Sequence, residues 1–148
     1  GCLKVFKDNL KNKKMRTRGV HFIVGTLTLM LFIVSGQYMG LRYGGFSTPE
    51  LYGHNEAVRY LHRANHIYLL LPALTNLLLS GYLTLALNRT RRMLQYIGSV
   101  LLIISPVLLT AAFLLEPPQP SPERPWTFYG IIAVFGGALL HLRLPRKE

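Results

Sequence analysis

Four long stretches without a charged residue limit what this 148-residue chain can fold into more than any other feature of its sequence. They cover residues 20–41, 64–88, 93–115 and 126–142. A helix needs about 20 apolar residues to cross roughly 30 Å of hydrocarbon. The stretches lack the alternation of barrel strands, and lipid admits only helices or closed barrels. The sequence therefore predicts an all-α polytopic membrane protein, an up-down bundle of four transmembrane helices over about 20–39, 62–87, 93–115 and 126–142.

The positive charges lie almost entirely on one side of this topology. An even number of spans places both termini and the 88–92 connection on the same side, which carries thirteen Lys and Arg residues against two acidic ones. The opposite side carries four of each, so the whole net charge of +11 lies on one face. Cytoplasmic loops of membrane proteins are enriched in Lys and Arg. We therefore expect a multi-pass protein of the cell inner (plasma) membrane with its N-terminus and C-terminus in the cytoplasm.

The same excess of charge does not point to nucleic acid. Topology and attraction to anionic lipid headgroups account for it. The lipid bilayer is thus an expected partner and nucleic acid is not. The single cysteine, Cys2, cannot form a disulfide within the chain.

Three regions follow from this topology. Residues 1–19 form a basic cytoplasmic N-terminal segment, 20–144 the transmembrane domain and 143–148 a basic cytoplasmic tail. The spacing of apolar and basic residues in 1–19 allows a short amphipathic helix on the membrane surface, and a frayed tail is the alternative. Residues 15–18, Met-Arg-Thr-Arg, resemble a natural start. We therefore expect residues 1–14 to be a variable or partly non-native extension.

The second stretch carries a narrow polar stripe on one helical face. Polar groups in lipid are costly unless they find partners, so we expect Asn76 to form hydrogen bonds across the bundle. Pro106 should kink the third span, and hydroxyls or neighbouring helices should meet the carbonyl that it frees. The stripe consists of His62, His66, Leu69, Ala73, Asn76 and Ser80. The predicted packing seam consists of Asn76 and Ser80 from this stripe and of Gln37, Gly36, Gly40 and Gly137 from other spans.

Histidines near the two membrane boundaries are the candidate cofactor ligands. His62 and His66 are one helical turn apart near the outer boundary, where one imidazole can ligate haem iron. His21 begins the first span and His141 ends the fourth, at similar depth, so that they can form a bis-histidine haem b site if those helices are neighbours. The alternatives are hydrogen bonds of His66 to Gln37, Tyr38 or the outer loop, and simple anchoring of His21 and His141 at the headgroups. The sequence predicts no metal site.

The outer face combines charged and aromatic residues on which a quinone headgroup, a lipid or a partner protein could dock; a solvated, salt-bridged cap is the alternative. We find no phosphate-cradling loop, zinc motif or nucleophile elbow. The spans contain no Asp or Glu, which argues against proton pumps and cation-coupled transporters. The outer residues concerned are Arg42, Arg59, Arg63, Glu50, Glu56, His54, His62, Tyr43, Tyr52 and Tyr60.

The run Arg63-Ala64-Asn65-His66 through Pro72 resembles the opening of the second span in the glutathione-linked membrane family MAPEG. Histidine and asparagine stand in the exchanged order, however, the family's glutamate is missing, and the charge distribution places the run on the outer side, away from cytosolic glutathione. More broadly, this run, together with residues 36–39 and 51–53, resembles small uncharacterised four-span bacterial inner-membrane proteins. That resemblance implies a fold and no activity.

Three functions are consistent with these features. The first is a non-catalytic accessory or interaction subunit of a larger membrane assembly, in contact with other membrane chains or with further copies of itself. The second is a haem- or quinone-binding redox subunit. The third is a carrier of lipid or another hydrophobic solute, with Pro72 and Pro106 as bending points. The sequence contains no catalytic constellation, which favours a protein that is not an enzyme.

Overall fold

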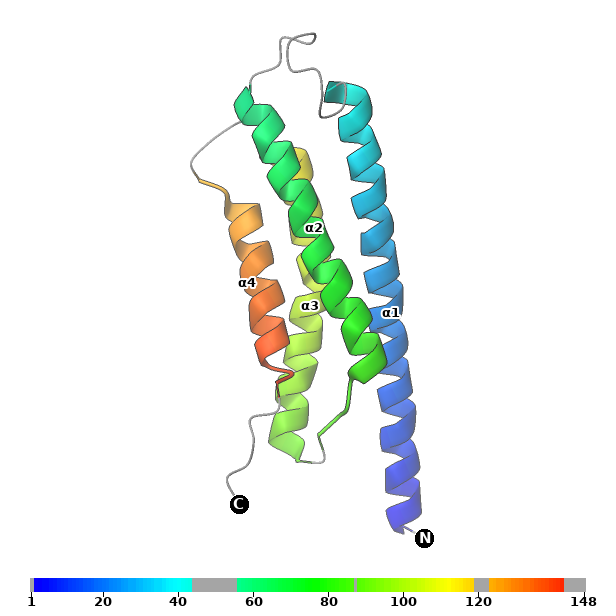
Figure 1. The fold of residues 1–148 in the computed structure, drawn as a ribbon. Helices are drawn as coiled ribbons and strands as arrows, with labels where there is room; N and C mark the ends of the chain where they lie inside the picture. Colours follow the sequence, from blue (N-terminus) through cyan, green and yellow to red (C-terminus); the bar gives the residue numbers. More distant parts are fainter. Residues whose placement is uncertain (1, 44–55, 87, 119–122, 143–148) are drawn as a thin grey trace.

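The part of the chain that the structure describes forms four α-helices. Figure 1 shows how they are arranged. The computed structural model describes residues 2–43, 56–86, 88–118 and 123–142, and within them the side chains of residue 12 and of residues 15 onward. The described residues contain no strand, so the predicted all-α class is confirmed. The helices are α1 (Cys2–Tyr43), α2 (Glu56–Tyr82), α3 (Arg89–Leu115) and α4 (Pro125–Leu139).

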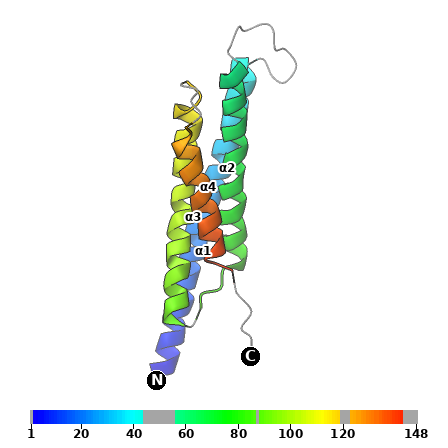
Figure 2. The same cartoon turned by 90° about the vertical axis from the view of Figure 1, so that its left-hand side faces the viewer.

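The helices run alternately up and down, and each packs mainly against its neighbour in the sequence. α1 packs along α2, α2 contacts α3, and α4 packs along α3. α1 and α4 therefore lie at opposite edges of the bundle, and the start of α1 and the end of α4 lie at the end that holds the α2–α3 connection (Figures 1 and 2). For convenience we call this the lower end and the opposite one the upper end.

The helix ends differ from the expected spans in several places. α1 has 42 residues, so one continuous helix contains the N-terminal segment and the first expected span. α2 ends at Tyr82, before the expected limit at residue 87, and α4 ends at Leu139. α3 begins earlier than expected because Asn88 caps it, its side chain accepting a hydrogen bond of 3.0 Å from Thr90 N. The run Ser-Thr-Pro-Glu at residues 47–50, which is typical of a helix start, and the candidate helix cap Asn55 lie outside the described residues.

Pro106 leaves the carbonyl oxygen of Leu102 without its usual helical donor. Ser105 Oγ donates to this oxygen at 3.0 Å, and Asn76 Nδ2 donates to it from α2, also at 3.0 Å. A hydroxyl on the same helix and an amide from a neighbour thus satisfy the freed carbonyl, as predicted. The bond from Asn76 also joins α2 to α3 in the middle of the bundle.

Glycines let α3 and α4 approach closely. A Cβ added at Gly137 would lie 2.6 Å from Leu102 Cγ, and one added at Gly98 would lie 2.8 Å from Gly137 O. Larger side chains at either position would push the helices apart. The apolar core next to this contact consists of Leu69, Leu102, Leu109 and Val134.

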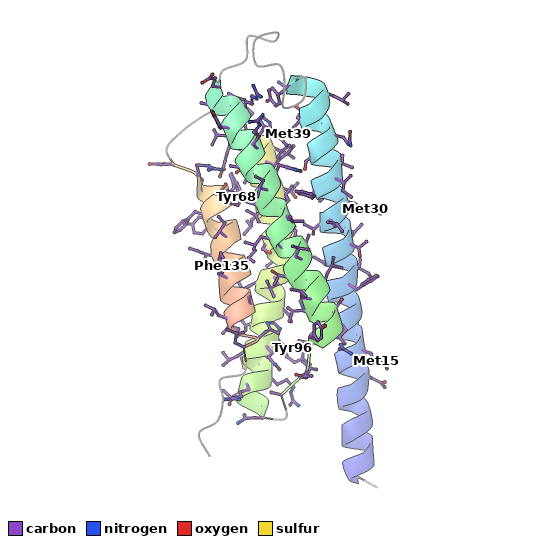
Figure 3. The ribbon with its side chains drawn as sticks, viewed as in Figure 1. Met15, Met30, Met39, Tyr68, Tyr96 and Phe135 are labelled. Carbon is purple, nitrogen blue, oxygen red and sulfur yellow. The ribbon has the colours of Figure 1, made fainter. Side chains whose placement is uncertain are left out.

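Within the described residues, two helices are long and apolar enough to cross a membrane, namely the Met15–Tyr43 part of α1 and the whole of α3. α4 is apolar but has 15 residues. α2 has 27 residues, and its polar stripe lowers its mean hydropathy. Large apolar side chains such as Met30 on α1 and Phe135 on α4 point outward from the bundle (Figure 3) and are more than half exposed.

Candidate functional site

Polar side chains cluster at three places in the bundle. One cluster lies between α1 and α2 near the upper end, the second joins α2, α3 and α4 at the upper end, and the third joins all four helices at the lower end. All four histidines among the described residues belong to the first or the third cluster.

His66 belongs to the first cluster and is held from two sides by α1. Its ring stacks on Phe32 with centroids 4.2 Å apart, and its Nδ1 lies 2.8 Å from Ser35 Oγ. Ser35 donates its own proton to Phe32 O at 2.9 Å, so its oxygen accepts from His66 Nδ1–H. The Nε2 lone pair consequently faces Gly36, where an added Cβ would lie 3.5 Å away.

A pocket of about 90 Å³ lies beside this lone pair, lined by His66, Gly36, Tyr43, Arg59 and Arg63 among others. This volume suits a few water molecules and is too small for a haem. The hydrogen bond expected between His66 and Gln37 does not form, because Gln37 lies on an exposed face of α1.

A second, larger pocket of about 560 Å³ opens on the other side of the α1–α2 contact. Leu31, Val34, Leu69, Phe113 and Leu114 give it mainly apolar walls. Its polar side chains lie toward the upper end of the bundle, and the rest of its wall is apolar. These polar residues are Ser35, Tyr38, Arg42, His62 and Thr110.

His62 lines the larger of the two pockets. Its Nδ1–H lies 3.0 Å from Val58 O and 3.1 Å from the Tyr43 hydroxyl, and its ring meets Phe113 edge to face at 5.2 Å. Tyr38 carries a hydrogen bond from Arg42, which also lies over its ring.

The second cluster, which we call the upper clasp, comprises Asn65, Glu116, Arg124 and Thr127. Glu116 is 7% exposed and accepts hydrogen bonds from Thr127 N at 2.9 Å, Thr127 Oγ1 at 2.5 Å, Asn65 Nδ2 at 3.2 Å and Arg124 Nε at 3.2 Å. Asn65 Nδ2 also donates to Ala112 O at 2.7 Å. Burial by itself raises the pKa of Glu116, but the bonds from Thr127, Asn65 and Arg124 outweigh it and lower the pKa below 4.5. The clasp fixes the upper ends of α2, α3 and α4.

The third cluster, the lower network, is a chain of hydrogen bonds through His21, Asn76, Ser99 and His141. His21 Nδ1 lies 2.6 Å from Asn76 Oδ1 and its Nε2 lies 3.0 Å from Ser99 Oγ. The same Ser99 Oγ lies 3.2 Å from His141 Nε2, and His141 Nδ1 lies 2.8 Å from Gly137 O. His21 and Asn76 are fully buried. The two histidines that the sequence places at similar depth are thus close, with ring centroids 6.2 Å apart.

This geometry does not fit a haem. Haem iron needs two imidazole nitrogens on opposite faces of a porphyrin, with the ring plane between them free of protein. Here Ser99 Oγ occupies the point on which both Nε2 atoms converge, and the tight contact between Gly98 and Gly137 lies beside it. Among the described residues, moreover, no three His, Cys, Asp or Glu side chains gather as a metal site would require.

The order Asn76–His21–Ser99 resembles the acceptor, imidazole and hydroxyl of a nucleophilic triad. Ser99 is 5% exposed, however, and its oxygen already faces a second imidazole. A substrate carbonyl cannot reach the hydroxyl without separating α3 from α4. The arrangement therefore favours storage or sharing of a proton over acyl transfer.

The other residues of the predicted packing seam differ in whether they contact another helix. Gly36 packs against His66 and Gly137 against Leu102, whereas a Cβ at Gly40 would meet nothing within 4 Å. Ser80 donates to Leu77 O of its own helix at 2.6 Å. Of the predicted seam, Asn76 alone carries hydrogen bonds between helices within the described residues.

Several of the partners in these clusters were not predicted. Ser35, Phe32 and Ser99 had no expected role, and Glu116 and Arg124 were counted only among the charges of the outer side. One signal was available: Asn65 and Asn76 both lie on the buried face of α2, and two buried amides predict polar partners on the helices opposite.

Comparison with protein-family models, with curated proteins and with solved structures finds no match for this chain. The function must therefore be argued from the geometry of the clusters and pockets themselves.

Proposed function

We propose that the chain is a four-span protein of the cell inner membrane, with both termini cytoplasmic, that serves as a non-catalytic accessory subunit of a larger membrane assembly. In this proposal the lower end of the bundle is the cytoplasmic end. Two apolar helices and the concentration of net charge at the termini and the α2–α3 connection support the topology. In this proposal α2 and α4 are the other two spans of the bundle.

The observation that carries this proposal is how the interior polar groups are used. Asn65, Asn76, His21 and Ser99 are buried, and each forms hydrogen bonds to another helix. Such bonds hold helices together where the hydrophobic effect does not. Polar groups used in this way support a structural role for the interior.

The face that remains for a partner lies on α1. Only 22% of its most apolar stretch is buried inside the bundle, against 44% for α3. Val34 is 64% exposed and Leu41 is 85% exposed. Gly40 has open space where a side chain would stand, so a second helix could approach α1 closely there.

Site-specific photocrosslinking in native membranes tests this role. A photoreactive residue at Val34 or Leu41 should give protein adducts of one or a few defined masses, while the same residue at Phe135 on α4 serves as the control. The adduct mass distinguishes a second copy of this chain from a different protein. Lipid adducts alone at both α1 positions would contradict the accessory role.

The larger upper pocket favours a second function, binding of an isoprenoid quinone. Its volume of about 560 Å³ suits a small ring with the first part of a tail, and its walls are largely apolar. His62, Tyr38 and Arg42 supply polar groups near a quinone headgroup at that end. The pocket opens between α1 and α3, which contact each other little, so a tail can leave toward lipid.

Extraction of bound quinone from the protein purified in mild detergent tests this second function. The wild-type protein should retain quinone at a substantial fraction of one molecule per chain. Leu114→Trp, at an exposed position in the pocket wall, fills the pocket and should abolish retention, while Leu78→Trp on the exposed face of α2 should not. Equal quinone content in both variants, or none in the wild type after quinone-replete expression, refutes the assignment.

A further inference from the structure

The lower network contains more hydrogen-bond contacts than a neutral protein has protons to fill. Four contacts link its groups in series: Asn76 Oδ1 to His21 Nδ1, His21 Nε2 to Ser99 Oγ, Ser99 Oγ to His141 Nε2, and His141 Nδ1 to Gly137 O. The direction of each bond can be worked out from its ends, because both ends are fixed acceptors.

The first end is fixed by the amide of Asn76. Its Nδ2 lies 2.9 Å from Pro72 O and 3.0 Å from Leu102 O. Carbonyl oxygens only accept, so both amide protons point at them and Oδ1 must face His21. The reversed amide would set its oxygen against two carbonyl oxygens. His21 Nδ1 therefore carries a proton and donates it to Asn76.

The second end is fixed by the backbone of α4. His141 Nδ1 lies 2.8 Å from Gly137 O, so this nitrogen also carries a proton. A neutral imidazole has one N–H. In the neutral state the Nε2 atoms of His21 and His141 are consequently both bare acceptors.

Both bare acceptors face the same hydroxyl. Ser99 has one proton, which can satisfy one Nε2 at 3.0 Å or the other at 3.2 Å. Three protons thus serve four contacts, and one buried contact would set a nitrogen lone pair against an oxygen lone pair. One added proton completes the series, because the protonated ring donates to Ser99 and Ser99 donates to the other ring.

We propose that His21, Ser99 and His141 form a binding site for one proton, which the two imidazoles share through the Ser99 hydroxyl. In one form His21 Nε2–H donates to Ser99 Oγ and Ser99 O–H donates to His141 Nε2. In the other form both protons have moved, so that His141 Nε2–H donates to Ser99 and Ser99 donates to His21. The exchange breaks one N–H and one O–H bond and forms one of each, without a net change of charge.

The surroundings give this proton a route from one side. His141 lines an open pocket of about 560 Å³ at the lower end of the bundle, together with Gln95 and Tyr82. His21 and Asn76 at the other end of the series are fully buried. The site therefore loads through His141 from the lower end of the bundle and does not form a path across it.

Groups on each helix set the affinity for the proton. The C-terminal carbonyls of α4 lie at His141 and favour a cation. The positive charge of Arg18, one turn before His21 on α1, disfavours a second cation nearby, although Arg18 Nη2 donates a hydrogen bond to Gly81 O. The nearest other charged or titratable side chains along the packed helices are Tyr82 on α2 and Arg92 and Tyr96 on α3.

Nitrogen-15 NMR of histidine-labelled protein in lipid nanodiscs tests the proposal, because imidazole nitrogen shifts distinguish the neutral tautomers from the imidazolium. A titration between about pH 5 and 9 should show His21 and His141 changing together, with one proton taken up by the pair. Ser99→Ala should separate their midpoints by about one pH unit or more. His62 and His66, at the upper end, act as internal controls that Ser99→Ala leaves unchanged.

Ser99→Thr retains the hydroxyl and should retain the shared titration. His141→Phe removes one acceptor, so a single Ser99 proton then satisfies His21, and the proton uptake by His21 should be lost from this range. Independent titration of the two rings in the wild type, two neutral rings throughout, or shared behaviour that survives Ser99→Ala would each overturn the proposal. Displacement of the proton by equimolar Zn²⁺ at neutral pH would assign the site to a metal and also overturn it.

Discussion

Replacement of Glu116 by alanine should loosen the upper clasp more than any other single change there. Glu116 is almost fully buried and accepts four hydrogen bonds from three residues on two helices and the connection between α3 and α4. Alanine removes every one of these acceptors at once. Thr127 N and Thr127 Oγ1, both in a buried residue, then have no carboxylate to meet, and Arg124 loses its counter-ion.

The size of the effect follows from these contacts. A hydrogen bond to a charged group contributes about 1.5–3 kcal/mol, and bonds that share one acceptor are not additive. The Arg124 side chain is 26% exposed, so solvent screens its ion pair and its share is small. We therefore expect Glu116→Ala to lower the free energy of unfolding by about 3 kcal/mol and Glu116→Gln, which keeps one carbonyl acceptor, by about 1–2 kcal/mol.

The pH dependence gives an independent signature. The folded protein holds the pKa of Glu116 below its ordinary value of 4.5. The carboxylate therefore stabilises the fold fully above about pH 4.5, and this contribution is lost as the pH falls through the lower, folded-state pKa. Glu116→Gln has no group to titrate and should show a flatter dependence of stability on pH in this acidic range.

Unfolding in mixed micelles of rising dodecyl sulfate fraction measures both effects. Trp126, the single tryptophan, precedes Thr127 on α4, so its fluorescence reports on the clasp directly. Glu123→Ala, at an exposed acidic position in the same connection, is the matched control and should change stability by less than about 0.5 kcal/mol. If Glu116→Ala unfolds at the same detergent fraction as the wild type, the clasp does not stabilise the bundle as argued.

Three further changes test other parts of the structure. Asn76→Ala leaves Leu102 O and His21 with one partner fewer and should cost about 1–3 kcal/mol in the same micelle assay; no loss would show that the mid-bundle amide is dispensable. Gly98→Leu should clash with α4 and cost about 1–3 kcal/mol or more, whereas Gly81→Ala, with open space around it, should be nearly neutral. In a background without the native cysteine, a cysteine at Asn12 should react with a membrane-impermeant maleimide only in inverted vesicles and one at Glu123 only in intact cells; the opposite pattern would reverse the proposed orientation.

The sequence predicts the helices well and their side-chain partners poorly, for a physical reason. Absence of charge over some 20 residues marks a helix, because backbone satisfaction leaves few other options. Depth follows from position along a helix, so the similar level of His21 and His141 was predictable. Which residue fills the space between two helices depends on their rotation and separation. Ser99 between the histidines and Phe32 against His66 could not be read from spacing on one helix.

Glu116 illustrates a different difficulty. In the sequence it stands at the end of an apolar stretch beside a proline-rich connection, where acidic residues are usually solvated. Its burial depends on three donors that come together only when α2, α3 and α4 are assembled. The number of charges in each connection bears on the orientation of the whole chain in the membrane. It does not distinguish a buried carboxylate from a solvated one.

The unbroken course of α1 makes it a torsionally stiff rod. Its 42 residues extend over about 63 Å, and its backbone is helical from the basic segment to the face that carries Ser35 and Gly36. Rotation or axial displacement applied at the lower end is therefore transmitted to the opposite end without a joint to absorb it. One residue inserted ahead of His21 would turn everything upstream by about 100° relative to the bundle, while an insertion of seven would nearly restore the original phase.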